Sequence, residues 1–209
     1  MLSMLQNISA MQLSAIVLAG GQSSRMGQDK ARLAPQGVPL LRQVCDIAFE
    51  CASRVYVVTF WPERYGDILP ASCLFIREVP LPGETEPHGP LVGFAQGLAQ
   101  VQTEWVLALA CDLPRLRVEV LREWMGLLAG ADSDVMVLLP RDEGVWQPLC
   151  GFYRLACLPL LTEYIRQGGR SFQGWLANCH VRELPVSDRN VLFNCNTPAD
   201  LETVCGGDL

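Results

Sequence analysis

The chain has 209 residues, of which 50% are hydrophobic and 18% are charged, and its formal net charge is -6. This length and composition allow a complete hydrophobic core in one domain and exclude a disordered chain. The negative charge and the lack of clustered lysine and arginine argue against a nucleic-acid partner, because phosphate backbones are bound by basic faces.

The N-terminal region lacks the positive charge that begins a secretory signal, since the first basic residue is Arg25. No uninterrupted apolar run reaches the ~18 residues that a membrane span needs. We interpret residues 1–209 as a single domain in which residues 1–12 form a flexible extension. A cytoplasmic protein without a membrane partner is expected.

Apolar segments of strand length recur along the chain, at Leu13–Ala19, Arg54–Phe60, Cys73–Ile76, Glu104–Cys111 and Asp134–Leu139. They rarely alternate with polar residues, which is typical of strands buried on both faces. Helix-length segments lie between them, at Leu40–Ala52, Pro62–Leu69, Leu91–Val101 and Val118–Ala129. This alternation predicts an α/β fold with a mostly parallel central sheet.

The pattern changes after Pro140. The segment VWQPLCGFYR predicts one strand, Leu155–Gln167 a helix, Phe172–Ala177 a short helix, and VRELPV a further strand. In the later segment NTPADLETV, Thr197 is placed to cap a helix and Pro198 to occupy its first turn.

The first strand runs into a glycine-rich segment, SAIVLAGGQSSRMGQDKARL. Gly20 and Gly21 allow a sharp turn whose N–H groups can hold an anion, and Arg25 and Lys30 add donors suited to phosphate oxygens. The spacing matches neither the GxxxxGK[ST] phosphate loop nor GxGxxG. Taken alone, the segment is equally compatible with a tight turn.

A second candidate is Asp112 in WVLALACDLP, where a buried strand delivers a carboxylate to the same edge of the predicted sheet. Mg²⁺ is commonly held by one or two carboxylates together with substrate phosphates. Asp112 alone is more typical of a turn or helix cap. Its pairing with the glycine segment favours a metal site.

The third candidate is FNCNTP, in which Asn194 and Asn196 flank Cys195. Two residues apart on an extended chain, both amides point to one face. They are able to bind a polar substrate or complete a metal shell, but taken alone an asparagine pair is more typical of turn capping.

The nine cysteines form no CxxC pair and no zinc-ligand pattern, and most lie in apolar runs. A catalytic cysteine requires an activating histidine, and only His88 and His180 are present. The cysteines are therefore interpreted as small core residues of a reducing compartment.

The segments LAGGQSSRMGQDKARL, GPLVGFAQGL, LALACDLP, QPLCGFYR and FNCNTPADL occur in an order that resembles the molybdenum cofactor guanylyltransferases, over Ala15 to Leu201. The resemblance implies a single-domain Rossmann-like nucleotidyltransferase. Such an enzyme transfers GMP from GTP to the phosphate of the molybdopterin cofactor, releases pyrophosphate and uses Mg²⁺. The implied partners are GTP, molybdopterin, molybdenum-insertion proteins and molybdoenzyme chaperones.

The resemblance also assigns roles to individual residues. Arg25, Lys30 and Asp112 are implied as the catalytic residues, with Asp112 as the metal ligand. Asn194 and Asn196 are placed on the pterin side. The residues implied to contact or line the nucleotide are Leu18, Ala19, Gly20, Gly21, Arg25, Lys30, Gly89–Leu91, Gly93 and Asp112.

Two positions depart from the family pattern. Glu78 stands where many relatives have an aspartate, and Thr59 where relatives present an asparagine, so both roles stay open. The alternatives are a molybdopterin cytidylyltransferase, a sugar-1-phosphate nucleotidyltransferase, and a noncatalytic nucleotide-binding accessory protein.

Overall fold

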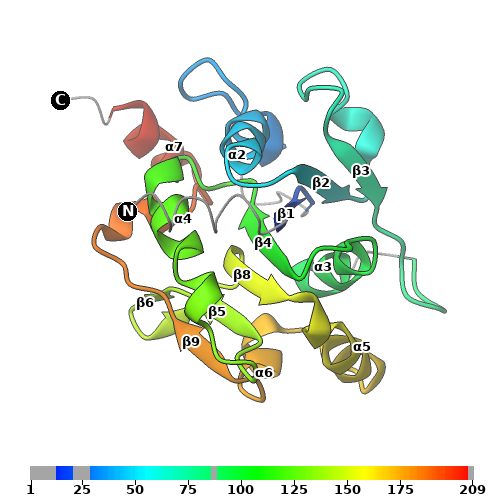
Figure 1. The fold of residues 1–209 in the computed structure, drawn as a ribbon. Helices are drawn as coiled ribbons and strands as arrows, with labels where there is room; N and C mark the ends of the chain where they lie inside the picture. Colours follow the sequence, from blue (N-terminus) through cyan, green and yellow to red (C-terminus); the bar gives the residue numbers. More distant parts are fainter. Residues whose placement is uncertain (1–12, 21–28, 86–88, 207–209) are drawn as a thin grey trace.

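The computed structural model describes residues 13–20, 29–85 and 89–206. These residues form a seven-stranded sheet flanked by helices, with a separate two-stranded hairpin (Figure 1). The sheet strands are β1 (Leu13–Leu18), β2 (Arg54–Thr59), β3 (Leu74–Arg77), β4 (Trp105–Ala110), β5 (Val137–Leu139), β8 (Cys150–Arg154) and β9 (Val181–Glu183), and the hairpin consists of β6 (Arg141–Asp142) and β7 (Val145–Trp146).

The α-helices are α2 (Leu40–Phe49), α3 (Pro90–Leu98), α4 (Val118–Met125), α5 (Leu158–Arg166), α6 (Phe172–Leu176) and α7 (Pro198–Cys205). Short 3₁₀ turns occur at η1 (Lys30–Arg32), η2 (Pro62–Arg64), η3 (Leu128–Gly130), η4 (Leu155–Cys157) and η5 (Arg189–Leu192). The start of α7 follows the prediction, since Thr197 and Asp200 form a capping box there.

The strand order is β3-β2-β1-β4-β8-β5-β9. β1 is parallel to β2 and β4, and β2 is parallel to β3. β8 is antiparallel to both β4 and β5, whereas β5 is parallel to β9. The predicted α/β fold with a mostly parallel sheet is therefore confirmed.

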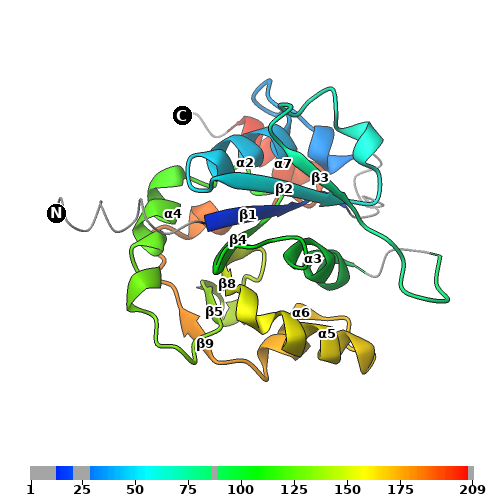
Figure 2. The same ribbon diagram turned by 45° about the vertical axis from the view of Figure 1, so that its right-hand side comes forward.

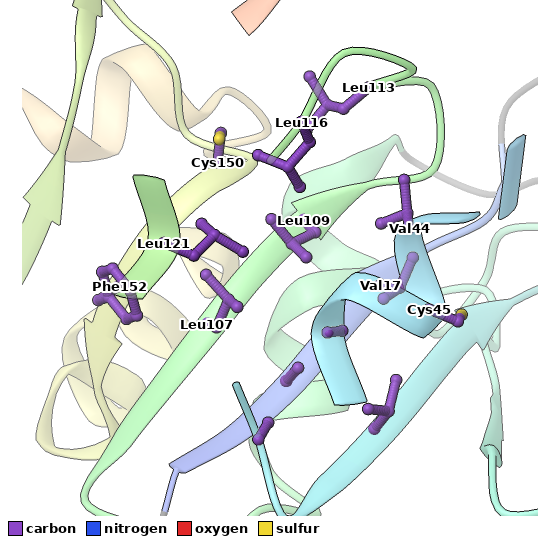
Figure 3. Close-up of a cluster of buried hydrophobic side chains, with 14 of the residues drawn as sticks. Val17, Val44, Cys45, Leu107, Leu109, Leu113, Leu116, Leu121, Cys150 and Phe152 are labelled. Carbon is purple, nitrogen blue, oxygen red and sulfur yellow. The ribbon is translucent and has the colours of Figure 1, made fainter. Parts of the chain in front are cut away.

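Alternate residues of the central strands enter two different cores, as expected of a sheet covered on both faces. Ala15 and Val17 of β1 pack in one core with residues of α2 and α4, and Ile16 packs in the other with α3, α5 and α6. Figure 2 shows α2 on one side of β1 and α3, α5 and α6 on the other. Figure 3 shows the first core, where Leu107 and Leu109 of β4 lie near Leu121 of α4.

Two local predictions were wrong. The predicted helix Pro62–Leu69 is only the 3₁₀ turn η2, because Tyr65 leaves the helical conformation with φ of -123° and Gly66 follows it. The single strand predicted at VWQPLCGFYR is divided into β7 and β8. Pro148 lies between them and has no N–H group to continue a ladder.

Among residues 13–20, 29–85 and 89–206, no helix has the length and apolar character needed to cross a bilayer. All nine cysteines are in the reduced form, and four of them are core residues of less than 3% exposure: Cys45, Cys150, Cys157 and Cys195. Residues 1–12, which we interpret as an extension, lie outside the described residues.

Candidate active site

The strand order places a topological switch between β1 and β4. The chain proceeds from β1 outward to β2 and β3, and returns through α3 to β4 on the other side of β1. Ligands of open α/β sheets bind beyond the carboxyl ends of the strands at such a point. Gly20 follows β1 and Asp112 follows β4, and the Cys111 N–H donates to the Leu18 carbonyl over 3.2 Å. The two predicted segments therefore meet at this edge.

A cavity of about 300 Å³ opens at this edge of the sheet. Its walls include Leu18, Gly20, Lys30, Asp112, Gln147 and Asn194. The volume lies at the small end of the range for ligand sites. The cavity thus unites residues that are far apart in the sequence, and all of those named except Gln147 were predicted to belong to the nucleotide or pterin site.

Lys30 connects two of the predicted groups across the cavity. Its Nζ donates to Asn196 Oδ1 over 2.7 Å and lies 3.6 Å from Asp112 Oδ2. The Cys195 N–H donates to the Asp112 carbonyl over 2.9 Å, which fixes the asparagine segment against the end of β4. A cation, a carboxylate and an amide are thereby held within reach of one bound molecule.

Asp112 is a partly desolvated carboxylate. Burial raises its pKa, while the charge of Lys30 lowers it, and the net direction is upward. Its side chain is 17% exposed, so it still faces the cavity. A carboxylate whose ionised form is incompletely compensated is a suitable ligand for a further cation.

The donor set at Asp112 fits Mg²⁺ but does not enclose it. Among the residues that the structure describes, no group of three histidine, cysteine, aspartate or glutamate side chains is placed to hold a metal. Mg²⁺ usually retains waters and takes further oxygens from substrate phosphates. Asp112 would therefore hold the ion together with a bound nucleotide rather than alone.

Glu78 lies after β3, close to Gly20 and Gly93. It is only 8% exposed, burial raises its pKa, and Oε1 has no hydrogen-bond partner among the described residues. A Cβ atom at Gly93 would lie 3.0 Å from Glu78 Oε2, and one at Gly20 would lie 3.9 Å from it. The two glycines therefore leave room for the Glu78 side chain.

Gly89 and Thr59 have local roles at this end of the site. Gly89 has a φ of +88° immediately before α3, a conformation that is strained for other residues. Thr59 is fully buried, and its Oγ1 accepts a hydrogen bond from the Trp61 N–H over 3.2 Å. Thr59 thus stabilises the turn after β2 instead of facing the cavity.

Asn194 and Asn196 differ in their surroundings. Asn194 lines the cavity, and its Nδ2 donates to the Leu192 carbonyl over 3.0 Å, which leaves Oδ1 directed to other partners. Asn196 is exposed and holds Lys30. Asn194 therefore makes a turn contact and also lines the cavity, and its role toward the pterin stays a prediction.

Comparison with known proteins identifies the family. Residues 15–181 match the model of the MobA-like NTP transferase domain. A probable molybdenum cofactor guanylyltransferase from Nostoc sp. is 56% identical over 194 residues, covering 93% of this chain and 91% of the relative. The chain belongs to the molybdenum cofactor guanylyltransferase family. It is therefore a nucleotidyltransferase.

A second relative supports the family assignment, and a solved structure has the same fold. A probable guanylyltransferase from Synechococcus elongatus is 43% identical and covers 93% of this chain and 98% of its own. The molybdopterin-guanine dinucleotide biosynthesis protein A of Archaeoglobus fulgidus has a TM-score of 0.74 at 23% identity, covering 92% of this chain and 97% of its own. At that identity the structural likeness supports the fold alone.

Within this guanylyltransferase family fold, the structure brings together Leu18, Gly20, Lys30, Asp112 and Asn194 at one cavity. Ala19 is buried beneath it, and its N–H donates to the Val58 carbonyl over 2.9 Å. Gly21 and Arg25, which were also predicted for the site, lie outside the described residues.

Gln147 and Tyr65 are among the cavity residues that had not been predicted for the site. Gln147 belongs to VWQPLCGFYR, which we predicted as one continuous strand, and the neighbouring Pro148 was the signal for the break at which Gln147 lies. Tyr65 was predicted to lie within the helix Pro62–Leu69, so the sequence did not indicate its place at the cavity. Both residues lie in segments that connect regular elements, where hydrophobic periodicity does not predict which side chains face a cavity.

Proposed function

We propose that this nucleotidyltransferase transfers GMP from GTP to the phosphate of the molybdenum-bearing molybdopterin cofactor, forming the guanine dinucleotide and pyrophosphate. The observation that carries the proposal is the Lys30–Asp112 pair, separated by 3.6 Å at the switch between β1 and β4. The similarity to relatives named as guanylyltransferases supports the substrate assignment.

The reaction needs no covalent protein intermediate. An oxygen of the acceptor phosphate attacks the α-phosphorus of GTP, and the bond from that phosphorus to the oxygen leading to the β-phosphate breaks. The electron pair leaves with pyrophosphate, and the acceptor phosphate needs no deprotonation by a side chain. Because anions must approach one another, positioning and charge neutralisation provide most of the catalysis.

Lys30 supplies a mobile ammonium group that can follow the phosphate oxygens of the bound triphosphate. Asp112 would hold Mg²⁺, which supplies charge neutralisation to the phosphates when it is bound. Asn196 orients Lys30 through their 2.7 Å hydrogen bond. Asn194, on the cavity wall, is placed to bind the acceptor.

Glu78 supports guanine as the transferred base. Guanine presents the N1–H and the 2-amino group side by side, and a carboxylate can accept both. Cytosine has a single donor, its 4-amino group, next to the N3 acceptor, so it cannot offer a carboxylate two adjacent N–H groups. The buried and unsatisfied Glu78 carboxylate therefore favours GTP over CTP.

The decisive experiment incubates the protein with molybdopterin, Mg²⁺ and each nucleoside triphosphate, and identifies the product by mass. We expect the guanine dinucleotide. A cytosine dinucleotide would assign the protein as a cytidylyltransferase, and transfer to a sugar phosphate would assign it to sugar nucleotide synthesis. Tight nucleotide binding without any product would indicate an accessory protein.

Glu78→Gln is expected to reduce kcat/KM for GTP by about tenfold to a hundredfold, because a hydrogen bond to a charged group contributes roughly 1.5–3 kcal/mol. The glutamine side chain keeps the shape and replaces one acceptor by a donor. Steady-state kinetics with GTP and with CTP give the ratio of the two kcat/KM values, which measures the preference for GTP. Binding of tripolyphosphate serves as the control and should not change. Unaltered preference for GTP would remove Glu78 from base recognition.

Asn194→Ala is expected to raise the KM for molybdopterin by roughly threefold to tenfold, with a smaller effect on GTP affinity, because one hydrogen bond contributes about 0.5–1.5 kcal/mol. Asn194 gives a cleaner test than Asn196, whose removal also releases Lys30. Acceptor titration at saturating GTP gives the KM. Normal molybdopterin use with a lowered melting temperature would leave Asn194 only the turn contact to Leu192.

A further inference from the structure

Tyr65 extends its hydroxyl group from the connection after β2 to the segment that carries Lys30. The residue is 2% exposed, belongs to the core that includes Ala31, and lines the cavity. Its hydroxyl donates to Asp29 Oδ2 over 2.9 Å. Burial raises the pKa of Tyr65, so the hydroxyl remains protonated and acts as a donor throughout the physiological range.

Asp29 uses both of its oxygens for structural bonds. Oδ2 accepts from Tyr65, and Oδ1 accepts from the Ala31 N–H over 3.1 Å. The second bond caps the 3₁₀ turn η1, in which Lys30 is the first residue. The carboxylate is therefore fixed next to the start of the turn.

The position of Asp29 creates a competition for Lys30. The two residues are adjacent in the sequence and carry opposite charges at the border of a partly desolvated cavity, where ion pairs are stronger than in water. Lys30 must instead direct Nζ to Asn196 and to the Asp112 side. A carboxylate bound on both oxygens is held in a fixed orientation and is less able to attract the lysine.

We infer that Tyr65 is a positioning residue for triphosphate binding: it restrains the Asp29 carboxylate, so that Lys30 extends toward Asp112. This role deepens the proposed function and rests on it, since it places the triphosphate at Lys30. Tyr65 acts through Asp29 and does not itself touch the reacting atoms.

Tyr65→Phe is expected to weaken GTP binding by about tenfold in the absence of Mg²⁺, because the released Asp29 Oδ2 then competes with phosphate for Lys30. The phenyl ring keeps its place in the core. Calorimetry with GTP and with tripolyphosphate measures the loss. Tyr56→Phe is the matched control, since Tyr56 is buried at 7% exposure in β2 and does not line the cavity.

The Asp29→Asn substitution in the Tyr65→Phe background separates positioning from packing. Asparagine can still accept the Ala31 N–H but carries no charge to attract Lys30, so the double variant should bind both ligands more tightly than Tyr65→Phe. Asp29→Asn alone completes the cycle. Thermal melts define the temperatures at which all proteins are folded and can be compared.

Two results would overturn the inference: unchanged binding of both ligands by Tyr65→Phe, or a double variant that binds no more tightly than Tyr65→Phe. Failure of the proposed function is distinguishable, because it would appear in the product made by the wild-type protein. The ratio of tripolyphosphate affinities between the wild type and Tyr65→Phe tests the role of Tyr65 independently of the base that the wild-type protein prefers.

Discussion

Lys30→Ala is expected to lower kcat/KM for GTP by at least about tenfold while the protein stays folded. Lys30 lies in a short 3₁₀ turn at the cavity and its side chain is 19% exposed, so its removal opens no large void in the core. A hydrogen bond from an ammonium to phosphate contributes roughly 1.5–3 kcal/mol. The triphosphate carries several negative charges in both the ground state and the transition state. We therefore expect KM for GTP to rise and kcat to fall.

Calorimetric GTP affinity, steady-state kinetics and circular dichroism measure the effect of Lys30→Ala. Arg42→Ala is the matched control, because it also removes one positive charge, from an exposed pair with Asp46 on α2. Its kinetics should equal those of the wild type. If Lys30→Ala also had wild-type kinetics, Lys30 would be a structural link to Asn196 and not a phosphate ligand.

The fold class was accessible from the sequence because each central strand is a short apolar run. Every residue of β1 is buried, and its alternate residues enter different cores, so the run reports burial on both faces. The reversed direction of β8 was not accessible, since a strand buried beside β4 has the same composition in either direction. Helical periodicity also did not distinguish an α-helix from η2. The segment is not a longer helix because the backbone of Tyr65 leaves the helical conformation.

Residues of the candidate site could be predicted from the sequence only where they directly follow a strand. Gly20 and Asp112 come after β1 and β4, so the sheet alone brings them to one edge. The Tyr65–Asp29 hydrogen bond joins residues 36 positions apart through a connection, and no periodic signal marks it. The missing partner of Glu78 Oε1 likewise depends on packing around Gly20 and Gly93, which exists only in the folded chain.

Asp112 can be tested by a substitution that removes charge and keeps shape. Burial raises the pKa of Asp112, so its folded state holds the proton more tightly than the unfolded state does. Ionisation of such a group costs stability, and the stability of the protein without ligand falls as pH rises through the raised pKa. Asp112→Asn removes this cost, so the variant should melt at the same temperature as the wild type or above it at neutral pH.

Asp112→Asn is expected to lose nearly all transfer activity, a fall of more than about a hundredfold in kcat, because an amide does not replace the negative charge that holds Mg²⁺ between protein and phosphates. The variant should also lose the increase in GTP affinity and in melting temperature that Mg²⁺ gives the wild type. Titrations of GTP with and without Mg²⁺, together with melts over a range of pH, measure both effects. Asp46→Asn, at an exposed position of α2, removes the same charge and should leave them intact. A stabilising cap would behave in the opposite way, since its loss lowers the melting temperature and spares Mg²⁺-dependent turnover. Near-normal turnover with reduced stability would therefore assign Asp112 to the turn after β4 and leave the metal to other ligands.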